Sequence, residues 1–129
     1  MSEPVWVIKS VVLAIHAEQL AEHSGESGLR DDSFLDFALE RPRNLFAYWS
    51  KDLFDLAATY ACGIMESHPF LDGNKRTAFV TSLLFLELNG VIIEANREDK
   101  VTVFLQLASH QWGEKELALW FKQNQRELG

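Results

Sequence analysis

The segment from Lys75 to Leu88 restricts the fold more than any other part of the sequence. Its apolar residues surround the helical wheel almost completely: Ala78, Phe79, Val80, Leu83, Leu84, Phe85, Leu86 and Leu88. A helix that is apolar nearly all round has to be enclosed by other elements. We therefore expect this helix at the centre of a bundle, beginning just after residues 72–74 and ending at Asn89 and Gly90.

The rest of the sequence predicts further helices. Apolar residues recur at helical spacing over 5–24, 34–39, 50–68, 96–107 and 114–121. Pro42 is expected to stop the second of these helices, which leaves 44–50 as a loop or hairpin, and the stretch 91–95 is expected to be briefly extended. The pattern predicts one all-α domain over residues 1–129, a bundle of about six helices.

Charge and composition exclude several function classes. Lys and Arg total 12 against 19 for Asp and Glu, a formal net charge of -7. This balance opposes broad attraction to nucleic acid or to an anionic membrane, so we expect neither as a partner and any anion must be bound locally. The single Cys62 lies in an apolar helical pattern, which favours a buried thiol in a reducing compartment. A cytoplasmic protein is the simplest prediction.

A polar stretch, HPFLDGNKRTA at 68–78, lies between the two helices expected at the centre. The N–H groups in the first turn of a helix lack partners within it and carry the positive end of its dipole, so this end binds phosphate. Lys75 and Arg76 lie in that turn. Gly73 permits close approach of the backbone to an anion, and Asn74 can cap the helix or donate to an oxygen.

Three other residues of the stretch complete a candidate active site. Asp72 supplies the hard oxygen ligand that Mg²⁺ prefers, and Mg²⁺ commonly binds through one or two carboxylates and substrate phosphates. His68 is a natural general base near neutral pH, able to accept a proton from a hydroxyl that attacks phosphorus. Phe70 has no polar role and is expected to anchor the loop in the core. Together these residues suit a nucleotide polyphosphate.

Each of these residues also has an ordinary structural explanation. A histidine at a helix end usually bonds a carbonyl, an aspartate before a helix usually caps it, and a Lys–Arg pair usually lies on solvated surface. Their occurrence together within nine residues favours a phosphate site. The other histidines, His16, His23 and His110, lack metal-ligand spacing. The role of His16 and that of the segment 41–50 stay open.

The stretch HPFLDGNKRTA resembles the signature of the Fic/Doc family, HxFx[DN]GN[GK]R, and the Lys after Asn is similar to the Doc branch. The resemblance extends to IHAEQLAEHSGESGLRD near the start and to LFDLAATYA before the motif. It implies a six-helix Fic fold with His68 as general base, Phe70 as loop anchor and Asp72 as Mg²⁺ ligand. The residues that it implies for phosphate binding are Gly73, Asn74, Lys75 and Arg76.

The Doc resemblance also implies an activity and a partner. It implies transfer of the γ-phosphate of ATP to a threonine of a translation factor such as elongation factor Tu, which stops translation. Because the inhibitory pattern [ST]xxxE[GN] of many Fic proteins does not occur in the sequence, inhibition is expected from a Phd-like antitoxin whose disordered segment folds into a groove. Trp49 and Trp112 are candidates to line that groove, although core packing explains each of them as well.

Two alternatives stay open. Fic enzymes proper transfer AMP and carry Gly at the position of Lys75 and a second Arg at the position of Phe79, so both departures in this chain point to Doc. Doc itself, however, tends to carry Ala where this chain has Gly73, which makes the loop intermediate between the branches. An adenylyltransferase is therefore the first alternative. A non-catalytic phosphate-binding module is the second.

Overall fold

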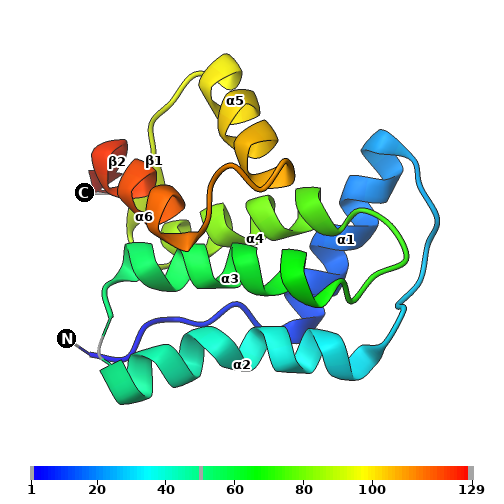
Figure 1. Ribbon diagram of the computed structural model, residues 1–129. Helices are drawn as coiled ribbons and strands as arrows, with labels where there is room; N and C mark the ends of the chain where they lie inside the picture. Colours follow the sequence, from blue (N-terminus) through cyan, green and yellow to red (C-terminus); the bar gives the residue numbers. More distant parts are fainter. Residues whose placement is uncertain (1, 50, 128–129) are drawn as a thin grey trace.

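The computed structural model describes residues 2–49 and 51–127 (Figure 1). This part of the chain contains six helices and two short strands. They are α1 (Lys9–His23), α2 (Asp32–Trp49), α3 (Leu53–Ser67), α4 (Asn74–Leu88), β1 (Val91–Ile93), α5 (Arg97–Ala108), α6 (Glu114–Gln123) and β2 (Gln125–Glu127). The prediction of an all-α fold of about six helices is confirmed.

Helices α3 and α4 run side by side through the centre and are joined by the loop at 68–73 (Figure 1). Helix α2 and helix α6 pack against α3, whereas α1 and α5 pack against α4. Leu56 and Ile64 of α3 and Phe85 and Leu86 of α4 are fully buried. The predicted central position of α4 is therefore confirmed, and the polar loop joins the two most enclosed helices.

Helix α2 differs from the prediction, because it continues through Pro42 to Trp49 and replaces the loop expected at 44–50. A proline inside a helix removes one backbone hydrogen bond and costs about 3 kcal/mol. Here Pro42 is buried, and beyond it Leu45 and Phe46 pack against the core, so tertiary packing offsets that cost. Ser50, which that prediction included, lies outside the described residues.

The chain before α1 also differs from the prediction, since α1 begins at Lys9 rather than near Val5. The backbone of Val5 exchanges hydrogen bonds with the side chain of Asn89, at 2.8 and 2.9 Å. The N–H of Val7 donates to the hydroxyl of Tyr60 at 3.0 Å. These side-chain partners, together with the stacking of Trp6 on Phe85, hold the segment extended.

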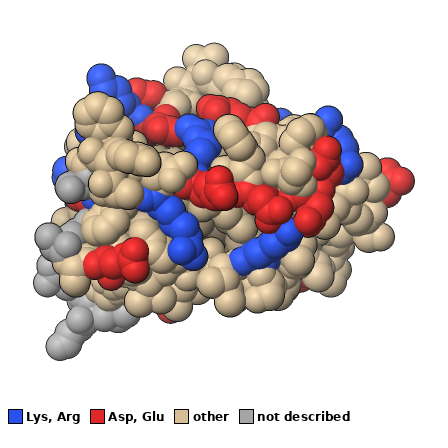
Figure 2. Space-filling view, turned by 90° about the horizontal axis from the view of Figure 1, so that it is seen from below, with Lys and Arg blue, Asp and Glu red and all other residues tan. Residues whose placement is uncertain are grey.

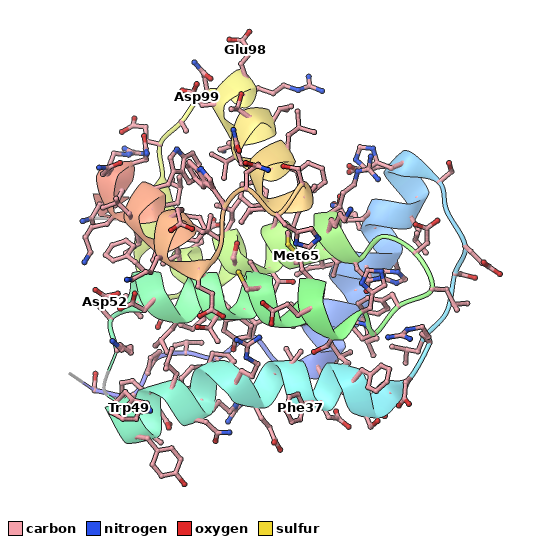
Figure 3. All side chains as sticks on the ribbon, viewed as in Figure 1. Phe37, Trp49, Asp52, Met65, Glu98 and Asp99 are labelled. Carbon is pink, nitrogen blue, oxygen red and sulfur yellow. The ribbon has the colours of Figure 1, made fainter. Side chains whose placement is uncertain are left out.

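The C-terminal half follows the predicted caps. Asn96 is the N-cap of α5 and accepts a hydrogen bond from the N–H of Asp99, which Figure 3 labels at the start of that helix. The stretch predicted to be extended forms β1, which pairs antiparallel with β2. Sequence patterns did not predict β2, whose three residues carry no apolar alternation.

Charged side chains of both signs lie next to one another on the face that α2 presents (Figure 2). Lys9 of α1 pairs with Asp32 and Asp36 of α2 at 2.7 and 2.8 Å, and Arg41 bonds both Glu66 and Glu114. Ion pairs at the surface contribute little stability individually. None of the described helices is both long and apolar enough to cross a membrane.

We predict that stability falls at alkaline pH and that Cys62 is one cause. Burial raises the pKa of the Cys62 thiol from 9.0 to about 12. Because the thiolate forms more readily in the unfolded chain, the free energy of unfolding should decline as the pH rises from about 9 to 12. Urea unfolding at pH 7 and pH 10 should show a smaller decline for Cys62→Ala than for the wild type. Equal declines in the two proteins would contradict this cause.

Candidate active site

His68 lies at the point where α3 ends and is exposed. Its backbone adopts a left-handed conformation, with φ 54° and ψ 53°, and its N–H donates to the carbonyl of Ile64. The Nδ1 atom of its ring lies 3.1 Å from the carbonyl oxygen of Met65. Because a carbonyl can only accept, Nδ1 carries the hydrogen in this contact, so in the neutral ring Nε2 has the lone pair that can accept a proton.

The segment from Gly25 to Asp31, here called the strap, pairs with the motif loop through the backbone. The N–H of Leu71 donates to the carbonyl of Gly28 at 3.1 Å, and the N–H of Arg30 donates to the carbonyl of Pro69 at 2.7 Å. The peptide groups of a loop have no partners in a helix or a sheet. The strap therefore provides hydrogen-bond partners for the N–H of Leu71 and the carbonyl of Pro69.

The side chain of Arg30 fastens the same loop at the end of α3. Its Nε donates to the carbonyl of His68 at 2.8 Å and its Nη2 to the carbonyl of Ser67 at 3.1 Å. Terminal carbonyls of a helix have no partner within it, and a cation is favourable at this end of the helix dipole. The guanidinium therefore stabilises the left-handed turn that carries His68.

The carboxamide of Asn74 closes the loop from the other side. Its Oδ1 accepts from the N–H of Phe70 and its Nδ2 donates to the carbonyl of Phe70, both at 2.9 Å. Asn74 is 4% exposed and Phe70 1%. Both polar atoms of the carboxamide thus bond the backbone of Phe70, and neither caps α4. Phe70 lies in the hydrophobic core.

Helix α4 begins at a residue without a side-chain cap. Gly73 is its N-cap, with φ 79° and ψ 14°, a conformation that favours glycine. The first turn therefore presents its N–H groups without competition from a capping side chain, and the exposed cations Lys75 and Arg76 lie in the same turn. This is the arrangement that binds phosphate at a helix N-terminus.

Asp72 is exposed beside this helix end. Its Oδ1 accepts from the N–H of Gly73 at 2.9 Å and its Oδ2 from the N–H of Glu26 at 3.3 Å. Each oxygen keeps a further lone pair, so the carboxylate can still act as a ligand of Mg²⁺. Among the described residues no three His, Cys, Asp or Glu side chains gather into a metal site. A Mg²⁺ ion held at Asp72 would take its remaining ligands from phosphates and water, which is the usual way in which proteins bind this ion.

The residues expected to act together line a single cavity of about 420 Å³. The motif contributes His68, Leu71, Asp72, Gly73, Asn74, Lys75 and Arg76, and α5 contributes Phe104 and Ala108. Sequence reasoning missed the two residues of α5, because they belong to an ordinary apolar pattern. The volume lies within the range of small-molecule sites in proteins.

A profile of the Fic/DOC family matches residues 6–86, and the chain therefore belongs to that family. It is similar to "Protein kinase doc" of Escherichia phage P1, with 36% identity over 81 residues, which cover 62% of this chain and 64% of that protein. It is also similar to "Toxin Doc" of Mycolicibacterium smegmatis, with 38% identity over 76 residues that cover 56% and 57% of the two chains. Both similarities support the Doc branch, and each spans less than two thirds of the relative's length.

We predict that Asn74→Ala destabilises the protein through the loop it closes. The change leaves the buried N–H and carbonyl of Phe70 without partners, which should lower the free energy of unfolding by about 2–5 kcal/mol. The exposed Asn44→Ala on α2 is the control, and its effect should stay within about 0.5 kcal/mol. Urea unfolding of both variants measures the difference. A loss for Asn74→Ala no larger than that of the control would contradict the prediction.

Proposed function

We propose that this chain is a toxin of the Doc type, an ATP-dependent protein kinase that phosphorylates a threonine of a translation factor such as elongation factor Tu. The observation that carries the proposal is one cavity lined by the exposed imidazole of His68, the carboxylate of Asp72 and the cationic first turn of α4. These groups suit a general base, a metal ligand and a phosphate-binding site. The proposal includes ATP and Mg²⁺ as cofactors, a cytoplasmic location and a single domain over residues 1–129.

The chemistry needs one proton transfer and one exchange of bonds at phosphorus. Nε2 of His68 accepts the proton of the threonine hydroxyl, whose oxygen forms a bond to the γ-phosphorus. The bond from that phosphorus to the bridging oxygen of the β-phosphate breaks, and ADP leaves with the negative charge. Lys75, Arg76 and the N–H groups in the first turn of α4 would hold phosphate oxygens. Asp72 would hold a Mg²⁺ ion, which would supply positive charge to offset the negative charge on those oxygens.

The position of Phe79 favours phosphate transfer over AMP transfer. Fic enzymes that transfer AMP carry a second arginine at this position. Phe79 is 8% exposed and lies with its ring centroid 6.5 Å from that of Phe104. No charge at position 79 is therefore available to hold a triphosphate in the orientation that AMP transfer requires.

A groove next to the active site suits the Phd-like antitoxin that the proposal includes. It has a volume of about 210 Å³ and lies between α1, α4 and α5, with apolar Phe79, Val80 and Phe104 beside cationic Arg76, Arg97 and Lys100. An acidic amphipathic segment would complement both features, and at Arg76 it would reach a phosphate-binding residue. Trp49, a candidate for this groove, is 72% exposed at the end of α2 and lines a separate hollow. Figure 3 labels it there.

The proposed function is tested by incubating the protein with cell extract and ATP labelled at either the α or the γ position. Label transferred to a protein only from the γ position supports the kinase. Transfer only from the α position would replace it with the adenylyltransferase, and transfer from neither position would leave a phosphate-binding module.

We predict that His68→Asn loses phosphate transfer by about a hundred- to ten-thousandfold, because it removes the general base. Asparagine tolerates the left-handed backbone, so the fold should persist. Nucleotide affinity should change little, since His68 is not expected to hold phosphate. His110→Asn is a matched control, because His110 is exposed and also has positive φ, 61°. A His68→Asn protein with wild-type turnover would show that His68 is structural only.

We predict that Lys75→Gly reduces phosphate transfer by about one to three orders of magnitude, the usual effect of losing one charged contact to phosphate. It also opens room in the first turn of α4, so a trace of AMP transfer is expected. Lys75→Met removes the charge but keeps the bulk, and should lose phosphate transfer without gaining AMP transfer. The mass added to the target protein separates these results. Phosphorylation by Lys75→Gly at the wild-type rate would show that Lys75 does not set the orientation of the nucleotide.

A further inference from the structure

His16 joins α1 to the motif loop, although no spacing in the sequence connects it to a function. It is 6% exposed. Its Nε2 lies 2.7 Å from the carbonyl oxygen of Asp72, and its ring stacks on that of Phe70 with centroids 3.7 Å apart and planes 7° from parallel. The imidazole is therefore in contact with both ends of the turn that leads into α4.

The hydrogen bond of His16 has a defined direction. A carbonyl oxygen only accepts, so Nε2 of His16 carries the hydrogen and donates it to Asp72. The ring also packs closely against Gly73, as a Cβ atom added to this glycine would lie 3.5 Å from Cδ2 and Nε2 of His16. A side chain that only filled space would not need an N–H group directed at the carbonyl of Asp72.

The carbonyl of Asp72, which His16 bonds, belongs to the same peptide unit as the N–H of Gly73. That N–H in turn bonds the carboxylate of Asp72, the proposed metal ligand. On one side of this unit the carbonyl of Asp72 accepts from His16, and on the other the N–H of Gly73 donates to Oδ1 of Asp72. A peptide unit is planar, so fixing its carbonyl also fixes its N–H. Rotation of the Asp72–Gly73 unit would break both hydrogen bonds and move the N-cap of α4.

We propose that His16 is a positioning residue. Its Nε2–H fixes the plane of the Asp72–Gly73 peptide and thereby places the Asp72 carboxylate for Mg²⁺ and the start of α4 for phosphate. This inference rests on the proposed function, since it concerns the same metal and nucleotide. Partners that orient a metal ligand in this way typically change metal affinity by about 10- to 100-fold when they are removed.

A pair of variants separates the donor from the shape of the side chain. His16→Gln keeps an N–H donor at a similar reach, whereas His16→Leu fills much of the space without a donor. Titration of MgCl₂ into protein and ATP measures the Mg²⁺ concentration for half-maximal nucleotide binding. We expect that concentration to rise about tenfold or more in His16→Leu and to stay within about threefold of wild type in His16→Gln.

Val12→Ala controls for loss of stability alone. Val12 is fully buried on the same helix and lies outside the motif cavity, so its truncation should lower the melting temperature without changing the Mg²⁺ dependence. His16→Leu with the Mg²⁺ dependence of wild type would overturn the proposal. So would a His16→Gln protein as impaired as His16→Leu, because the stacked ring alone would then matter.

A readout without ligand separates failure of this inference from failure of the proposed function. In ¹⁵N NMR spectra of the ligand-free wild type, Nε2 of His16 should carry a hydrogen that exchanges slowly with water. Absence of that hydrogen would overturn the inference even if the protein phosphorylates its target. Wild-type protein that neither binds Mg²⁺ with ATP nor transfers phosphate would instead overturn the proposed function, and with it the role of His16.

Discussion

The loop between α3 and α4 depends on one constraint: its peptide groups lie outside regular structure and need partners from elsewhere in the fold. Asn74 supplies both partners of Phe70, the strap bonds Leu71 and Pro69, and His16 bonds Asp72. An unpaired buried peptide group costs about 1–3 kcal/mol, so the loop keeps this shape only while α1, the strap and α4 are assembled. The candidate active site is therefore a product of tertiary structure, although its residues are contiguous in sequence.

The side chains of the motif fall into a buried group and an exposed group that lines the cavity. Phe70 and Asn74 are buried and use their side chains within the protein, whereas His68, Asp72 and Lys75 are exposed at the cavity. A buried anchor contributes stability through packing and hydrogen bonds, and an exposed ionisable group costs little desolvation. The cavity can therefore carry cationic and anionic groups side by side without a large cost to the fold.

Sequence patterns predicted the elements whose signals are local. The all-round apolar character of α4, the cap at Asn96 and the break at Pro69 each act within a few residues, and each prediction was confirmed. The errors fell at Pro42, where packing against the core outweighs a local helix breaker, and near Val5, where side chains distant in sequence hold the chain extended. The residues of the motif are contiguous, so the motif could be found from the sequence. His16, Arg30 and Phe104 are distant from it in sequence and lie next to it only in the folded protein.

Arg76 links the proposed chemistry to the proposed regulation. It lines the motif cavity, where a nucleotide would lie, and also the groove between α1, α4 and α5. Its guanidinium can hold one anion firmly at a time, because bidentate bonding engages its fixed fork of donors. A carboxylate on a segment in the groove would thus compete with phosphate for the same donors. Inhibition by a partner would then need no change in the shape of the loop.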